Sequence, residues 1–198
     1  MKPIVILKRV IFAAALIPAA ALVVGAVTDG LTANPIDYIT DQTGTSALTF
    51  LAVTLTITPI RRLTGWNEVI KLRRMLGLFA FFYASAHFLT WFVLDHFFNV
   101  AGMAEDVVER RFITMGMTTY LMLWPLALTS TTAMIRRLGR RWQQLHRLTY
   151  LAAITAVIHF WWLVKADVRE PRNWAVVMLL LLGFRAWWMW RTRRPSRS

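Results

Sequence analysis

The stretch LHRLTYLAAITAVIHFWWLVK, from Leu145 to Lys165, is apolar and reaches the ~20 residues that a helix needs to cross a membrane. It carries two histidines, His146 and His159, which are thirteen residues apart. Ionisable side chains in a membrane helix are costly and usually have a function. The stretch therefore predicts a helical membrane protein, and it marks two imidazoles whose partners must come from elsewhere in the sequence.

Composition supports a membrane protein and excludes several kinds of site. Hydrophobic residues make up 57% of the 198 residues, which is more than a soluble domain of this size usually contains. The absence of cysteine excludes disulfides, iron–sulfur clusters, thiolate metal sites and covalent c-type haem attachment. Neither a G-x-G-x-x-G motif nor a loop long enough for a nucleotide-binding domain is present. The chain is therefore expected to receive electrons, if it carries them, from a partner or a lipid-soluble donor.

Six apolar segments predict an all-α integral membrane protein, with residues 1–198 forming a single six-helix bundle. Backbone groups in lipid must pair internally, so each segment is expected to be a helix. The first segment is expected to remain as a span, because its apolar run is longer than that of a signal peptide. The second is short and rich in threonine. The expected spans are roughly 10–28, 45–60, 75–98, 112–135, 145–165 and 173–190.

Charged residues alternate between the two sides of the predicted bundle. The N-terminus, the loops 61–74 and 136–147 and the tail from Arg185 carry 18 Lys or Arg and one acid, Glu68. The remaining loops carry five Lys or Arg and nine acids. The positive-inside rule then places both termini in the cytoplasm. The net charge of +13 is therefore attributed to topology and to anionic lipid headgroups, and nucleic acid is not expected as a partner.

Two histidines are expected at the same depth in the bundle. His87 lies fifteen residues after Leu72, where the third span begins, and His159 lies about as far into the fifth span. At 1.5 Å per residue both imidazoles are ~22 Å deep, on parallel helices. Such a pair can ligate a haem iron from both faces, and filling both axial positions favours electron transfer. The alternative is that these histidines are unligated and bond to neighbouring helices.

The other histidines have no such partner. His146 lies ~20 Å below His159, and the position that would complete a second haem holds Arg74, beside Arg73. Because guanidinium groups bind phosphate, this inner site is expected to hold either an irregularly ligated haem or a phosphate-bearing or quinone-like partner, with Arg73 and Arg74 as phosphate or propionate partners. Lipid-facing topology charges are the alternative. His96 is expected at the surface.

Three stretches resemble the ferric-reductase-like transmembrane family, and within it the haem-binding membrane subunits of protein-methionine-sulfoxide reductase systems. They are TPIRRLTGWNEVIKLRRMLGLFAFFYASAHF (58–88), RRFITMG (110–116) and LWPLALTSTTAMIRRLGRRWQQLHRLTYLAAITAVIHFWWLVK (123–165). The resemblance covers nearly the whole chain and carries over His87, His146 and His159. The chain departs from the four-histidine branches of the family, because its third span supplies only one usable ligand.

The resemblance implies a function that composition alone does not give. It implies haem b, with FMN as a further cofactor, in the bacterial inner membrane. Electrons would come from the quinone pool or a cytosolic flavin reductase and pass to a periplasmic molybdenum enzyme that repairs oxidised methionine in proteins. The chain itself would have no substrate-reducing site. The alternatives are a transporter or assembly factor with packing histidines, and a stand-alone ferric or quinol reductase.

Overall fold

The computed structural model describes residues 3–193, which form helices joined by short connections and contain no strand. This confirms the predicted all-α class. The helices are α1 (Pro3–Val27), α2 (Pro35–Thr64), the 3₁₀ turn η1 (Asn67–Val69), α3 (Ile70–Leu89), the π-helical turn η2 (Thr90–Asp95), α4 (Val100–Glu109), α5 (Arg111–Leu128), α6 (Thr132–Leu138), α7 (Arg140–Leu145), α8 (Leu148–Leu163) and α9 (Arg169–Arg193).

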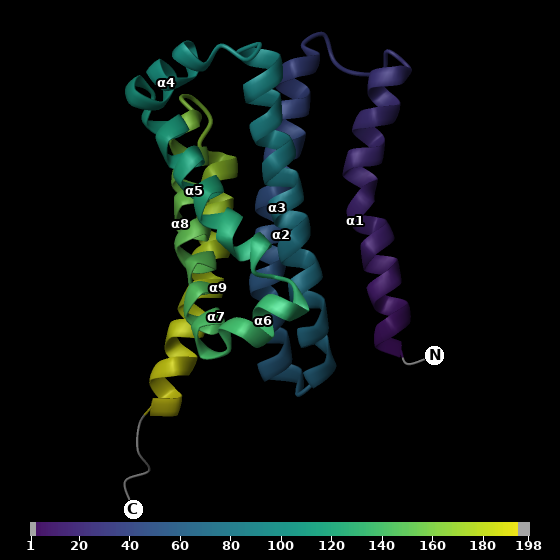
Figure 1. Ribbon diagram of the computed structural model, residues 1–198, viewed down its shortest axis with the longest axis vertical. Helices are drawn as coiled ribbons and strands as arrows, with labels where there is room; N and C mark the ends of the chain where they lie inside the picture. The colour runs from purple at the N-terminus through teal and green to yellow at the C-terminus, as the bar shows by residue number, and fades with distance from the viewer. Residues whose placement is uncertain (1–2, 194–198) are drawn as a thin grey trace, which may run out of the picture.

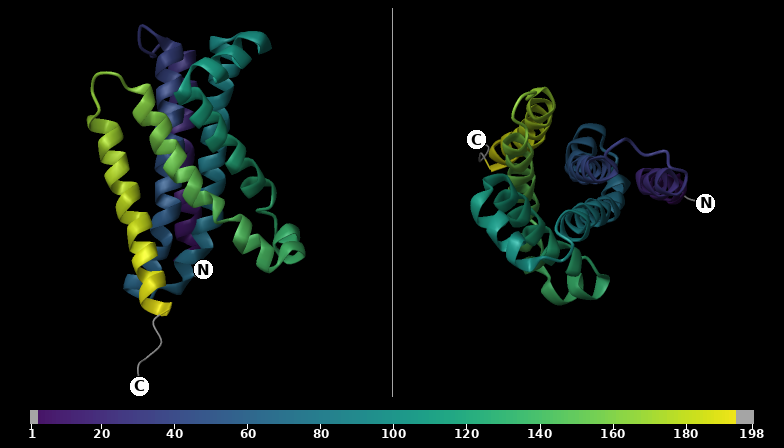
Figure 2. Two further views of the ribbon diagram at one scale, coloured as in Figure 1. Left: turned by 90° about the vertical axis from the view of Figure 1, so that its left-hand side faces the viewer. Right: turned by 90° about the horizontal axis from the view of Figure 1, so that it is seen from above.

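The long helices form two groups that face each other. Seen from above in Figure 2, α1, α2 and α3 lie on one side and α5, α8 and α9 on the other. Helix α2 packs along α3, and α5 packs along α8. Helix α4 lies across one end of the bundle, whereas α6 and α7 lie near the other, where α1 begins and α9 ends (Figure 1).

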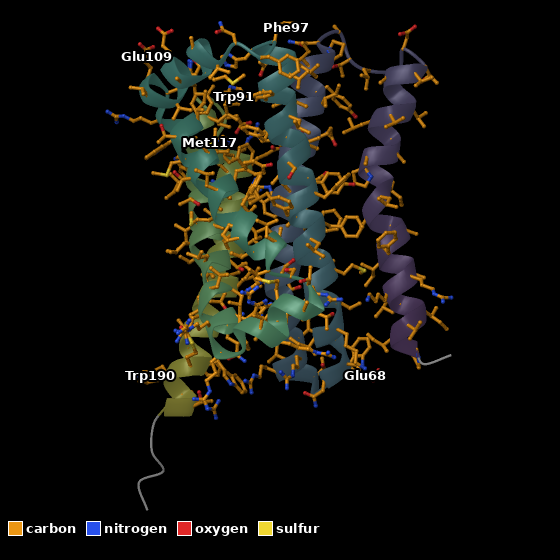
Figure 3. All side chains as sticks on the ribbon, viewed as in Figure 1. Glu68, Trp91, Phe97, Glu109, Met117 and Trp190 are labelled. Atoms are coloured by element: carbon orange, nitrogen blue, oxygen red, sulfur yellow. The ribbon has the colours of Figure 1, made fainter. Side chains whose placement is uncertain are left out.

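The two ends of the bundle differ in charge. We call the end with α4 the acidic end, and the end where α1 begins and α9 ends the basic end. Glu109 lies at the acidic end, whereas Glu68, the single acid among the basic-end loops, lies at the other with Trp190 (Figure 3). Both described termini thus share the basic end, as an even number of passes requires.

Helix α2 is much longer than the predicted span of 45–60. It begins at Asn34, whose side chain accepts a hydrogen bond from the Asp37 backbone N–H, and ends at Gly65 with a φ of 72°. Its polar first half resembles a loop in composition. However, Thr43 is buried and donates its hydroxyl hydrogen to the Ile39 carbonyl of the same helix at 2.7 Å. Thr43 therefore faces inward without leaving its hydroxyl unpaired.

The segment predicted as a span over 112–135 is not one continuous helix. Helix α5 ends at Leu128, and the chain turns by 93° into α6. Pro125 has no backbone N–H, so one helical hydrogen bond is missing near the end of α5. The Thr129 hydroxyl donates to the Pro125 carbonyl at 2.6 Å. Thr131 then caps α6 by accepting from the Met134 N–H at 3.2 Å. The chain at 132–145 consequently lies across the basic end instead of crossing the bundle.

The helices are long and apolar enough for a multi-pass membrane protein. Four of them, α1, α2, α3 with its flanking turns, and α9, can cross a membrane, and the bent pair α5–α6 is a fifth candidate. Helix α8 has 16 residues, fewer than the ~20 that a span usually needs. Six spans and cytoplasmic termini therefore remain predictions.

A buried hydroxyl on α3 makes hydrogen bonds to the backbone of α1. Tyr83 on α3 is 1% exposed; its hydroxyl donates to the Ala15 carbonyl at 2.6 Å and accepts from the Ala19 N–H at 3.2 Å. An unbroken helix would pair these two backbone groups with each other. Pro18 lies between them, so the Tyr83 hydroxyl satisfies both groups where the proline interrupts α1.

Candidate functional site

His87 and His159 lie opposite each other between the two helix groups. His87 comes from α3 and His159 from α8, and their ring centroids are 6.1 Å apart with an angle of 77° between the ring planes. Both imidazoles line one cavity. The matching depths estimated from the sequence therefore correspond to a real proximity in the fold.

The hydrogen bonds of the two imidazoles define their tautomer. Nδ1 of His87 lies 2.9 Å from the Thr40 carbonyl oxygen, and Nδ1 of His159 lies 2.6 Å from the Phe112 carbonyl oxygen. A carbonyl oxygen only accepts, so each Nδ1 must carry the hydrogen and donate it. Each neutral ring then keeps an unprotonated Nε2, which is the form that binds a metal.

The separation of the rings fits one metal ion bound between them. An imidazole nitrogen lies about 2.0 Å from a bound metal and about 1.1 Å from its ring centroid, so two trans ligands place their centroids about 6.2 Å apart. The observed 6.1 Å agrees with this value. Within residues 3–193 no group of three or more His, Asp or Glu could hold a metal. A group that supplies the remaining ligands itself, such as the macrocycle of haem, fits this arrangement.

A glycine lies against each imidazole. A Cβ built on Gly44 of α2 would lie 3.0 Å from Cε1 of His87, and one built on Gly116 of α5 would lie 2.8 Å from Nδ1 of His159. Real Cβ atoms essentially never approach closer than 3.0 Å. Gly116 thus requires a residue without a side chain if His159 is to keep its place, whereas a Cβ at Gly44 would be a tight contact that His87 must yield to by a few tenths of an ångström.

The two histidines are held in the same way by two equivalent helix pairs. In each pair the carbonyl that accepts from the histidine lies 47 residues before it. The two glycines are 72 residues apart in the sequence (44 and 116), as are the two histidines (87 and 159). The buried Ala80 and Ala152 follow the same offset (80 and 152). Helices α2–α3 and α5–α8 therefore form a structural repeat, with one imidazole from each copy.

The cavity around the two imidazoles has the size of a cofactor pocket. Its volume is about 690 Å³, within the range of ligand pockets in proteins. Ala84 and Ala156, which lie three residues before the two histidines, line it together with Gly44 and Gly116. Trp91 also lines the cavity, and its buried Nε1–H has no acceptor among residues 3–193. The cavity thus contains an unpaired donor, and Figure 3 shows Trp91 near the acidic end of the bundle.

His96 is not the surface residue that the sequence predicted. Its side chain is 17% exposed, lines the cavity toward the acidic end and places Nε2 3.0 Å from Oδ2 of Asp106. The Nε of Arg110 donates to the other oxygen of Asp106 at 3.0 Å. The π-helical turn η2 and the following residues, Phe97 and Phe98 with positive φ, carry the chain from α3 over to α4 and bring His96 to Asp106.

His146 lies at the basic end, away from the other imidazoles. Its ring stacks on Trp142 with centroids 3.8 Å apart, and its Nδ1 lies 3.0 Å from the Trp142 carbonyl oxygen. Because Nδ1 donates there, Nε2 of the neutral ring carries no hydrogen. The nearby Leu126 carbonyl therefore cannot serve as its partner, and Nε2 is buried without a hydrogen bond. His146 offers a free lone pair, but no second imidazole faces it.

The two neighbouring arginines have different surroundings. Arg73 is partly buried and close enough for its charge to act on His146. Arg74 is exposed, and its Nη1 donates to the Thr132 hydroxyl on α6 at 3.3 Å. The structure therefore brings Arg73 toward His146, whereas Arg74 is directed to the surface.

Comparison with known proteins identifies the same group as the sequence motifs. Residues 43–157 match the family of the ferric reductase-like transmembrane component. A protein of Herminiimonas arsenicoxydans named protein-methionine-sulfoxide reductase heme-binding subunit MsrQ is 49% identical over 98% of this chain and 90% of its own length. Proteins of the same name from Ralstonia nicotianae (48% identity, 92% of this chain, 85% of that protein) and Bordetella pertussis (45%, 96% and 94%) are similar. No solved structure matches the chain.

Proposed function

Because the chain belongs to the ferric reductase-like transmembrane family, among relatives named MsrQ, we propose that it is the haem b electron-transfer subunit of a protein-methionine-sulfoxide reductase system. In this proposal His87 and His159 are the axial ligands of the haem iron. The observation that carries it is the pair of unprotonated Nε2 atoms on rings whose centroids are 6.1 Å apart. A packing role would not require this spacing.

The residues of the cavity fit a bound haem. His87 and His159 would hold it from both faces, and the two glycines leave room for the imidazoles that face it. Trp91 Nε1–H and the Arg110 guanidinium are donors toward the acidic end of the cavity and would hold the propionates. Bound haem supplies a site that accepts and releases one electron. A haem held by His87 and His159 together would favour electron transfer over oxygen chemistry.

The basic end would receive electrons. We place this end in the cytoplasm, as the positive-inside rule predicts, and take the free Nε2 of His146 and the Arg73 guanidinium as the input site. These groups suit a flavin such as FMN, a quinone or a second haem, and Arg74 lies beside them at the surface. The donor would then be the quinone pool or a cytosolic flavin reductase.

The acidic end would deliver electrons. The cavity with His87 and His159 extends to residues of this end, including Asp106 and Arg110. We propose that an MsrP-like, molybdenum-containing reductase in the periplasm docks there and repairs oxidised methionine in proteins. The chain would accordingly reside in the bacterial inner membrane, with electrons crossing it from the basic end to the acidic end.

This function can be tested with the purified chain in lipid nanodiscs. A water-soluble quinol, or NADH with a flavin reductase and FMN, should reduce the haem, and an MsrP-like reductase with methionine sulfoxide should reoxidise it. With subsaturating donor, His146→Ala should slow reduction about tenfold or more, the loss expected when a polar partner of the donor is removed. Dithionite should still reduce this variant fully. Failure of both donors on a haem that dithionite reduces would contradict the proposal.

A further inference from the structure

We propose that a second, smaller pocket between α2 and α9 binds the phosphate of an anionic phospholipid. The pocket has a volume of about 130 Å³ and lies near the basic end, apart from the cavity of the two histidines. It does not depend on the haem or on the proposed electron transfer. Its lining consists of Thr58, Arg62, Phe184, Arg185, Trp188 and Met189.

The polar groups of this pocket are held in place by neutral partners. Arg185 is partly buried; its Nη1 donates to the Thr58 hydroxyl at 3.1 Å, and its guanidinium lies 4.6 Å from the centroid of the Tyr150 ring. The Arg62 guanidinium lies 5.3 Å from the centroid of the Trp188 ring. These contacts orient both cations without neutralising either of them.

The pocket lacks the negative charge that its cations require. Its lining contains no Asp or Glu, and neither arginine belongs to an ion pair within residues 3–193. Arg62 and Arg73 lie close enough to act on Arg185 by charge, which adds repulsion. Trp188 contributes a buried Nε1–H that has no acceptor in the described part of the chain. An anion with several acceptor oxygens would neutralise the arginines and also accept the hydrogen bond of Trp188 Nε1–H. Phosphate is such an anion, and guanidinium groups bind it with two parallel hydrogen bonds.

The position of the pocket favours a lipid over a soluble phosphate. Arg185 lies eight residues before Arg193, the end of α9, which is ~12 Å along the helix axis. If α9 spans the membrane as its length allows, this level is expected near the headgroup layer. Met189 is 49% exposed beside the pocket, and Phe184 provides further apolar surface for an acyl chain. Anionic lipids are attracted to basic groups at this level, and pockets between helices bind their headgroups.

Lipid binding by the full-length chain, measured by native mass spectrometry in detergent, tests the site. The probes are dioleoyl-phosphatidylglycerol and its zwitterionic phosphatidylcholine analogue. The wild-type chain should retain the anionic phosphatidylglycerol preferentially, and Arg62→Gln or Arg185→Gln should each weaken the binding of this lipid about tenfold. Arg191→Gln is the matched control, because it removes the same charge from α9 at a residue that contacts Trp187 instead. It should bind as wild type does.

Two further measurements keep the result unambiguous. Trp188→Phe keeps an aromatic ring but removes the N–H, and a weakening of about threefold or more would support the pocket even if an arginine variant folded poorly. Inorganic phosphate at millimolar concentration should not displace the lipid; displacement that the pocket variants abolish would support the same site with a soluble anion as its ligand. Equal retention of phosphatidylglycerol by the wild-type and all pocket variants, or equal retention of both lipids, would overturn the proposal.

Discussion

Replacement of His87 or His159 by alanine is expected to remove the haem between them. Each imidazole supplies one axial nitrogen, and no third His, Asp or Glu within residues 3–193 lies close enough to replace it. Loss of one ligand also leaves the opposite ring facing an empty position in an apolar cavity. We therefore expect haem content below about a tenth of wild type, the scale of affinity loss for removing a metal ligand or its support.

Haem content per chain, measured by the pyridine haemochrome assay on purified variants, checks this expectation. His96→Ala is the matched control, because it removes an imidazole at the far rim of the same cavity and should keep the haem. His146→Ala distinguishes one haem per chain from two. If the only haem lies between His87 and His159, the haem content should not change; if the input site also holds a haem, the content should fall by half. Full haem in both His87→Ala and His159→Ala would show that the pairing is wrong.

Adding one methyl group at Gly116 is expected to disturb the site almost as strongly. The new Cβ would lie 2.8 Å from Nδ1 and 2.9 Å from Cε1 of His159, so the ring must move away from its Phe112 carbonyl. Gly44→Ala should act more weakly in the same direction, because its nearest atoms, Cε1 and Nδ1 of His87, are at 3.0 and 3.1 Å. The expected results are loss of most haem for Gly116→Ala and a shift toward high-spin iron for both.

The optical spectrum of the ferric form and the haem content of each variant test this role. Gly77→Ala is the control, since its Cβ would meet only Thr54 Cγ2, at an ordinary 3.8 Å. This substitution should leave both measurements at the wild-type value, so that a general intolerance of alanine in these helices can be recognised. A Gly116→Ala variant with the wild-type low-spin spectrum and full haem would exclude the close approach as a determinant of ligand geometry.

Much of the fold was accessible from the sequence because membrane helices obey simple rules. Apolar length predicted helices, charge alternation predicted that both termini share one end, and the rise of 1.5 Å per residue predicted that His87 and His159 lie at one depth. The failures have local causes. The polar first half of α2 hid a helix whose threonines bond to their own backbone, and Pro125 with Thr131 ended a segment that hydropathy read as continuous.

The supports of the candidate site were harder to predict. Gly44 and Gly116 stand in helices that contain no histidine, and only their shared offset of 72 residues from each other, matched by the two histidines, could have revealed them. The unequal surroundings of Arg73 and Arg74 depend on where α6 turns, which composition does not encode. The directions of the Arg73 and Arg74 side chains at the inner site could therefore not be predicted from the sequence.

The proposed function requires that His87 and His159, whose ring planes lie at 77° to each other, hold one haem iron between them. Electron paramagnetic resonance of the purified ferric chain, with a reduced-minus-oxidised absorbance spectrum of the same sample, tests it most directly. Two nearly perpendicular imidazoles should give a low-spin b-type haem with a strongly anisotropic signal. A sample without any haem absorbance, as expected of a non-redox membrane protein with packing histidines, or a purely high-spin signal from singly ligated iron, would contradict the account.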